Sequence, residues 1–189
     1  MARPYLLKAM HKALIIGYGN PLRSDDGFGW QASRLLAREF AGQEAQVITC
    51  HQLTPELAEP LSQCRRAVFI DADREGEPGD VHLQTVRPQA PTSSTFTHSC
   101  SPSGLLASAE MLYGYCPQAL IITVTAQSFA FGESLSPVVS EALPEVVDQV
   151  CQFTSLHRQS RPSSPSRKRG ARLVQNKPES RRLMGMTGG

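Results

Sequence analysis

The chain has 189 residues, enough for one α/β domain with a full core and short for two. Its formal charge of +2 hides an asymmetry: residues 157–189 carry nine Lys/Arg and one Glu, whereas residues 1–156 carry ten basic and sixteen acidic side chains. Five scattered cysteines without a CxxC pair argue against a disulfide framework or a zinc motif. We find no signal-peptide pattern and no run of about 18 apolar residues, and we therefore expect a cytoplasmic protein with no membrane partner.

The first half of the chain alternates apolar segments with helical patterns. Residues 13–19 predict a buried strand that stops at glycine, and residues 28–40 repeat apolar side chains at helical spacing. A second strand is predicted over residues 46–50. A short helix follows over residues 53–61, with a threonine N-cap, a proline in the first helical position and a second proline that limits its length. Residues 67–72 predict a third strand, which ends in an acidic turn.

The second half continues the alternation. Residues 81–86 alternate apolar and polar side chains, as a strand near a sheet edge does. Residues 87–100 are rich in Pro, Ser and Thr and are typical of a loop. A helix is predicted over residues 101–113, the last strand over residues 119–126, and a final helix that Ser136 caps.

Alternating strands and helices with continuously apolar strands predict a three-layer αβα sandwich with a largely parallel central sheet of about five strands. We assign residues 1–156 to this domain. Residues 157–189 combine low hydropathy, Ser/Pro clusters and clustered positive charge, and we expect them to form a basic, disordered tail.

Acidic side chains follow two of the predicted strands. Asp25 and Asp26 lie in the glycine-rich loop after the first strand, and Asp71 ends the third. In an open parallel sheet, ligands bind beyond the carboxyl ends of the strands, so these acids lie at one edge, which His98 can also reach from its loop. Two carboxylates and an imidazole suit a divalent transition metal with positions open for a substrate.

Ordinary roles remain open for each of these residues. Asp25 or Asp26 can cap the following helix, Asp71 can cap a turn, and His98 can be a solvated loop residue. The segment "GYGNPL" does not fit the dinucleotide fingerprint, because Leu22 occupies the third glycine position. A nucleotide-binding, flavodoxin-like module is a further alternative, although adjacent carboxylates repel the phosphates that a helix amino terminus attracts.

Several motifs occur in one order along the chain: "GYGNPLRSDDGFG", "HQLTPELAEPL", "FIDADREGEPGDV", "THSCSPSGLL" with "LYG", and "FGESLSP". Over residues 13–152 this series resembles the [NiFe]-hydrogenase maturation endopeptidases. The second motif is most similar to the type that serves bidirectional, NAD-linked hydrogenases.

The resemblance implies an activity and a partner. Proteins of the family are hydrolases of the aspartic-type endopeptidase class, and they remove a short C-terminal peptide from the hydrogenase large-subunit precursor once nickel has been inserted. The metal-contacting positions of the family correspond here to Asp26, Asp71 and His98. The resemblance thus implies that these three residues bind nickel presented by the precursor, with Asp25 either as base for the attacking water or as a helix cap. A non-catalytic, nickel-sensing chaperone of the large subunit is the alternative.

Two features lie outside the family pattern. Cys100 can act as a thiolate that recruits zinc, but we favour a small apolar residue that packs under its loop. The basic tail could contact nucleic acid through its positive charge; it has no interleaved aromatic residues, and we do not expect a nucleic-acid partner.

Overall fold

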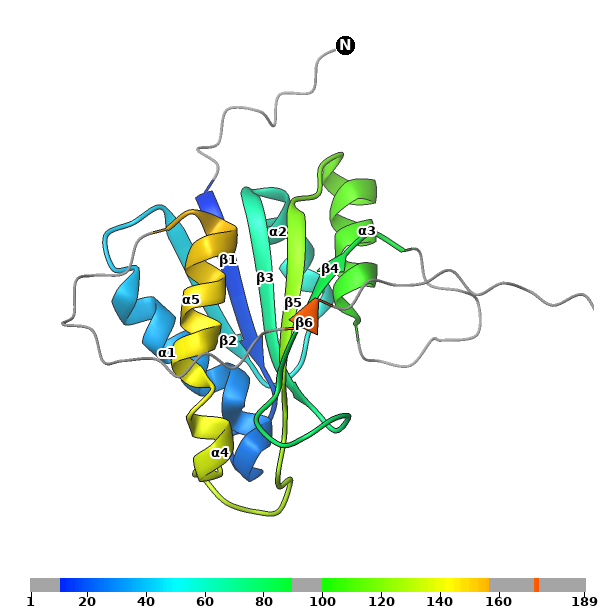
Figure 1. The fold of residues 1–189 in the computed structure, drawn as a ribbon. Helices are drawn as coiled ribbons and strands as arrows, with labels where there is room; N and C mark the ends of the chain where they lie inside the picture. The colour runs from blue at the N-terminus through cyan, green and yellow to red at the C-terminus, as the bar shows by residue number, and fades with distance from the viewer. Residues whose placement is uncertain (1–10, 90–99, 157–171, 174–189) are drawn as a thin grey trace, which may run out of the picture.

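A six-stranded sheet forms the centre of the computed structural model, which describes residues 11–89, 100–156 and 172–173 (Figure 1). The strands are β1 (His11–Tyr18), β2 (Ala45–Cys50), β3 (Cys64–Asp73), β4 (Val81–Val86), β5 (Gln118–Thr125) and the two-residue β6 (Arg172–Leu173). Their order is β2-β1-β3-β5-β4-β6. All neighbours are parallel except β4 and β5. The predicted largely parallel sheet is confirmed.

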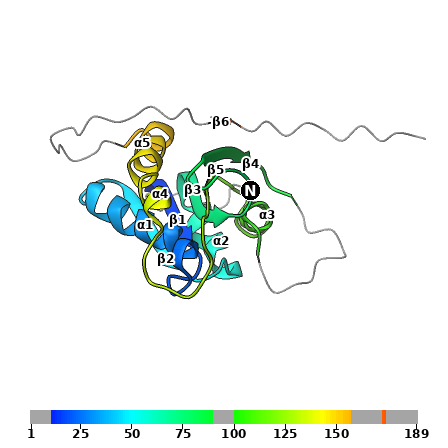
Figure 2. The same ribbon diagram turned by 60° about the horizontal axis from the view of Figure 1, so that its bottom comes forward.

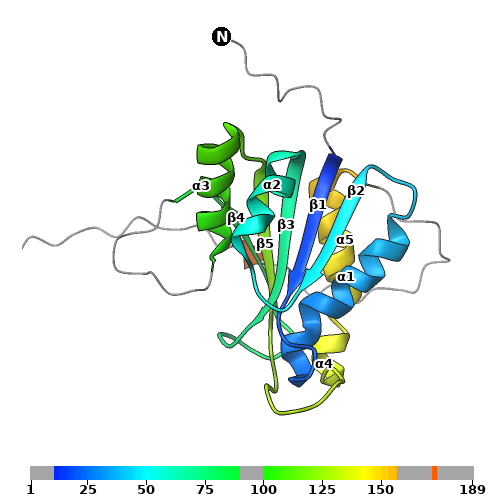
Figure 3. The same ribbon diagram turned by 180° about the vertical axis from the view of Figure 1, so that it is seen from behind.

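Helices cover both faces of this sheet. On one face lie α1 (Phe28–Glu39), the short α4 (Pro137–Ser140) and α5 (Leu143–Thr154), and on the other lie α2 (Ala58–Ser62) and α3 (Pro102–Tyr113). Figures 2 and 3 show the resulting three layers from the end and from behind. Two 3-10 turns, η2 (Ser24–Gly27) and η3 (Pro55–Leu57), precede α1 and α2.

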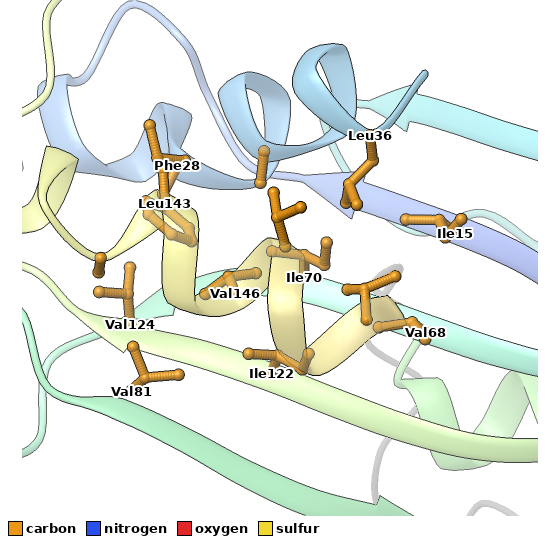
Figure 4. Close-up of a cluster of buried hydrophobic side chains, with 14 of the residues drawn as sticks. Ile15, Phe28, Leu36, Val68, Ile70, Val81, Ile122, Val124, Leu143 and Val146 are labelled. Atoms are coloured by element: carbon orange, nitrogen blue, oxygen red, sulfur yellow. The ribbon is translucent and has the colours of Figure 1, made fainter. Parts of the chain in front are cut away.

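The core is divided by the alternation of side chains along the strands. In β1, Ala13 and Ile15 face α1 and α5, whereas Leu14 and Ile16 face α2 and α3. The same alternation in β3 places Val68 beside Ile15 in the first cluster, which Figure 4 shows. Because both faces are buried, the strands read as continuous apolar runs in the sequence.

The ends of two helices differ in how well sequence predicts them. Ser101 caps α3 as its side chain accepts the N–H of Gly104 at 3.1 Å, and Gly114 ends the helix in the left-handed conformation. The single final helix predicted from Ser136 is wrong, because the chain forms α4 and then α5. Ser136 makes no side-chain cap bond there. Its hydroxyl donates to Asp25 instead.

Several predictions fall on residues outside the described ranges. His98 and most of the predicted 87–100 loop belong to this group, as does the basic tail apart from β6. The assignment of residues 157–189 as a disordered tail therefore stays a prediction. Among the helices of the described residues, none combines the length and apolar character needed to cross a bilayer.

Candidate active site at the carboxyl edge of the sheet

The loop after β1 turns back on itself and fixes the Asp26 carboxylate. Gly19 has a φ of +122°, and a Cβ there would lie 2.0 Å from the carbonyl oxygen of Asp26, so only glycine fits. The N–H of Asn20 donates to Asp26 Oδ2 at 3.0 Å. Asn20 Oδ1 accepts the N–H of Leu22, also at 3.0 Å. Asn20 thereby holds the turn, and among the described residues no donor is bonded to Asp26 Oδ1.

Asp71 lies on the neighbouring strand, near the same edge. β1 and β3 are parallel, with Gly17 opposite Ile70, so the chain after each strand emerges side by side. The N–H of Ala72 donates to Asp71 Oδ1 at 2.9 Å. Burial raises the pKa of Asp71 to about 6, and the negative charge of Asp26 adds to the rise. The two acids that the sequence singled out therefore act on each other electrostatically.

A different acid holds the turn that Asp71 could have capped. Asp73 Oδ1 accepts the N–H of Glu75 at 3.2 Å, and Asp73 Oδ2 accepts the hydroxyl of Thr123 at 2.7 Å. Asp73 thus performs the turn-capping role that the sequence left open for Asp71.

Tyr18 is a site residue that sequence reasoning missed. Its hydroxyl donates to the Asp71 carboxylate, and this bond favours the ionised carboxylate and lowers the pKa of Asp71. Burial, together with the Asp71 charge, raises the pKa of Tyr18, so the phenol stays protonated as a donor. The available signal was strand alternation: Tyr18 follows Leu14 and Ile16 at a spacing of two and ends β1 with a polar tip.

Trp30 of α1 joins the glycine loop to the end of β2, which the sequence also did not reveal. Its indole Nε1 donates to the carbonyl oxygens of Gly19 and Cys50, both at 3.0 Å. Its ring meets that of His51 edge-on, with 5.1 Å between centroids. The N–H of Gly19 donates to the His51 carbonyl at 3.3 Å. The glycine loop is therefore hydrogen-bonded to the end of β2 as well.

Asp25 has a structural position that differs from its predicted role as a helix cap. Its side chain is fully buried, and the carboxylate accepts the N–H groups of Gln127, Ser128 and Ser136 together with the Ser136 hydroxyl, at 2.6 to 2.9 Å. Neither η2 nor α1 receives a side-chain cap. The four donors hold this carboxylate against the loop after β5, and its role as base for the attacking water stays a prediction. We therefore assign Asp25 to holding the loop after β5.

The third predicted metal-contacting residue, His98, lies outside the described residues. Within the described ranges, no three His, Cys, Asp or Glu side chains gather as a metal site. Cys100 packs against the core cluster under α2 and α3, and burial raises the pKa of its thiol. This position agrees with the apolar role favoured for Cys100.

Comparison with solved structures finds the same architecture in hydrogenase maturation peptidases. A hydrogenase 2 maturation peptidase from a Thaumarchaeota archaeon shares 22% identity over 77% of this chain and 99% of its own, with a TM-score of 0.57. The [NiFe] hydrogenase maturation protease HycI from Thermococcus kodakarensis shares 18% over 80% of this chain and 96% of its own, with a TM-score of 0.61. The hydrogenase maturating endopeptidase HybD from E. coli shares 18% over 74% and 90%, with a TM-score of 0.60.

The chain has the fold of these peptidases. No family model matches the sequence, and no curated protein does. At these identities the likeness establishes the peptidase fold alone. What the site can do must then be argued from its residues. Two carboxylates lie at the carboxyl edge of the sheet, where the charge of Asp26 raises the pKa of Asp71, and a phenol orients Asp71.

Proposed function

We propose that the chain is an endopeptidase that removes a C-terminal peptide from the nickel-loaded precursor of a [NiFe]-hydrogenase large subunit. The observation that carries the proposal is the pairing of Asp26 and Asp71 at the carboxyl edge of a peptidase fold. The solved structures that share this fold include proteins described as hydrogenase maturation peptidases. The series of motifs over residues 13–152 supports the same activity.

In this proposal nickel belongs to the substrate rather than to the peptidase. Asp26 and Asp71 each offer a carboxylate oxygen, and His98 is the proposed third donor. Imidazole suits nickel, and the precursor's own ligands complete the coordination. A peptidase that needs the substrate's metal to bind its substrate recognises only precursors that have been loaded.

The residues of the site have separate tasks in peptide cleavage. Asp26 and Asp71 bind the metal-bearing end of the precursor, and this contact positions the scissile peptide along the edge of the sheet. Tyr18 holds Asp71 in place through its hydroxyl. A nickel ion held there can polarise the scissile carbonyl or lower the pKa of a bound water.

The decisive experiment compares nickel-free and nickel-loaded precursor after incubation with the purified protein, by intact mass spectrometry. We expect loss of a C-terminal peptide from the loaded form alone. Asp26→Asn, Asp71→Asn and His98→Gln should each reduce the cleavage rate at least about 100-fold, because each removes a direct ligand. Glu133→Gln serves as the control, since it neutralises an exposed carboxylate at the same end of the molecule.

The other outcomes have definite meanings. Binding of the loaded precursor without cleavage would favour the non-catalytic, nickel-sensing chaperone. Cleavage of both forms at equal rates would show that nickel is not required for recognition. Wild-type cleavage rates in all three variants would show that Asp26, Asp71 and His98 do not form the site.

A further inference from the structure

Two large apolar side chains stand exposed beside the paired acids. Leu22 is 54% exposed and Phe131 is 94% exposed. Leu22 belongs to the loop after β1, and Phe131 to the loop that joins β5 to α4, which projects at the carboxyl end of the sheet in Figure 1. We call these two residues the apolar rim pair. Single exposed apolar residues are common on proteins, so the pair matters only if something holds its members together.

Backbone hydrogen bonds hold the two loops together. The N–H of Ser24 donates to the Gly132 carbonyl at 2.7 Å, and the N–H of Gly132 donates to the Leu22 carbonyl at 3.0 Å. Phe131 is thus the chain neighbour of a residue bonded directly to Leu22. The Ser24 hydroxyl also donates to the Ala130 carbonyl at 3.1 Å. The buried Asp25 carboxylate anchors the same loop at both of its ends.

The other phenylalanine of this loop has a different environment. The guanidinium of Arg74 lies over the ring of Phe129, 4.6 Å from its centroid, and Arg23 Nε donates to the Phe129 carbonyl at 3.3 Å. Phe129 therefore helps to fix the loop, whereas Phe131 is held out into solvent. Because the backbone that carries Phe131 is already fixed, covering this side chain does not require the loop to be ordered as well.

The apolar rim pair lies close to the proposed point of nickel contact. Leu22 and Asp26 are four residues apart, so their Cα atoms are at most about 14 Å apart. The turn between them is closed by bonds from the Arg23 N–H to the Asn20 carbonyl and from the Asp26 N–H to the Arg23 carbonyl, which shortens that span. An extended peptide advances about 3.3 Å per residue, so one that is fixed at Asp26 reaches Leu22 within about four residues.

We propose that Leu22 and Phe131 bind an apolar side chain of the substrate, on an extended segment of the precursor within about four residues of the part held at Asp26 and Asp71. This inference extends the proposed function and depends on it. When a partner covers exposed aromatic or aliphatic side chains, the apolar surface removed from water favours binding. The pair would then select precursors by the sequence around the cleaved bond, separately from selection by nickel.

The test measures KM and kcat for cleavage of the nickel-loaded large-subunit precursor by wild type, Leu22→Ser and Phe131→Ser, together with the affinity of each protein for that precursor. We expect KM to rise about tenfold in each variant with kcat within about twofold of wild type, because a binding contact is lost and the acids are untouched. Leu112→Ser is the matched control: Leu112 is 62% exposed near the end of α3, beside the amino end of β5.

The readouts separate this inference from the proposed function. Wild-type cleavage with unchanged KM and affinity in both rim variants would overturn the apolar contact and leave the peptidase proposal standing. An equal loss in Leu112→Ser would also overturn it, because the effect would then follow exposed apolar area anywhere on the surface. Failure of wild type to bind or cleave the loaded precursor would overturn both proposals.

Discussion

A single buried carboxylate fastens the loop that borders the site. Asp25 accepts four hydrogen bonds on two oxygens, three of them from backbone N–H groups of residues more than 100 positions away. Such a charge is stable when buried because four donors compensate it, and losing the carboxylate leaves buried donors without an acceptor. Asp25 is therefore a main anchor of the loop that presents Phe131, together with the backbone bonds to Leu22 and Ser24.

Asp25→Asn should lower the free energy of unfolding by about 2–4 kcal/mol, since the amide turns an N–H donor toward N–H donors. Urea denaturation followed by circular dichroism measures this loss. Glu133→Gln, which changes an exposed carboxylate of the same loop, should stay within about 0.5 kcal/mol of wild type. A stable Asp25→Asn variant that had lost its cleavage rate would instead return Asp25 to the role of base.

The raised pKa of Asp71 predicts a pH dependence of stability. Burial shifts the pKa of this carboxyl from 3.8 to about 6, so between these values the folded chain keeps a proton that the unfolded chain has released. The contribution of Asp71 to the free energy of unfolding therefore falls as pH rises from about 4 to about 6. Urea denaturation of metal-free wild type and Asp71→Asn across this range should show the difference between them change in favour of the variant. Parallel curves would contradict the shift.

At the scale of elements, helix α1 approaches β1 closely enough to exclude a side chain. A Cβ at Gly17 would lie 2.0 Å from the Gly29 carbonyl oxygen and 2.1 Å from Ser33 Oγ. This approach lets the start of α1 lie beside the end of β1, where Trp30 reaches the Gly19 carbonyl. The position of the glycine loop is thus set by the close packing of α1 against the backbone of β1.

Gly17→Ala should destabilise the fold by about 3 kcal/mol, because the methyl group must push the helix away from the sheet. Thermal and urea unfolding would measure it. Gly42→Ala is the control: no atom lies within 4 Å of its Cβ position, so only its φ of +80° opposes the change, at about 1 kcal/mol. Equal losses in the two variants would show that the close approach has no particular energetic weight.

Sequence reasoning succeeded where the signal is local and failed where it is long-range. The apolar runs of β1 and β3 and the Ser101 cap of α3 follow from neighbours in the chain. The same holds for the location of Asp26 in the loop after β1 and of Asp71 near the end of β3. The role of Ser136 could not be predicted this way. Its hydroxyl and N–H bind a carboxylate 111 positions earlier, and this pairing exists only once the sheet has formed.

Tyr18 and Trp30 were missed for the same reason. Tyr18 looks like one more large residue at the end of an apolar strand, until β3 places Asp71 beside it. Trp30 fits the helical apolar pattern of α1. Its N–H finds acceptors only when β1 and β2 end side by side and bring the Gly19 and Cys50 carbonyls together. Local patterns place Tyr18 and Trp30 on a strand and a helix, but their hydrogen-bond partners come from distant parts of the chain.

At the scale of the whole molecule, charge is divided between a body of −6 and a basic segment over residues 157–189. The described core extends through Leu156, which is 4% exposed and belongs to the cluster around α1 and α5. Within the part of the tail that the structure describes, β6 pairs two residues with β4. The proposed site lies at the carboxyl ends of β1 and β3. In the sheet order, β5 and β4 stand between β3 and β6.

A chain ending at Leu156 should therefore keep its fold and its cleavage rate. We expect the free energy of unfolding to change by less than about 1 kcal/mol, since the residues removed include only a two-residue strand among those described. Retention on a cation-exchange column should fall sharply, because the truncation removes nine basic side chains and only one acid. A different result would make the tail an electrostatic contact with the precursor: the truncated chain cleaves more slowly than the full chain at low salt, and high salt lowers the full chain to the same rate. Exposed charges attract each other only until salt screens them.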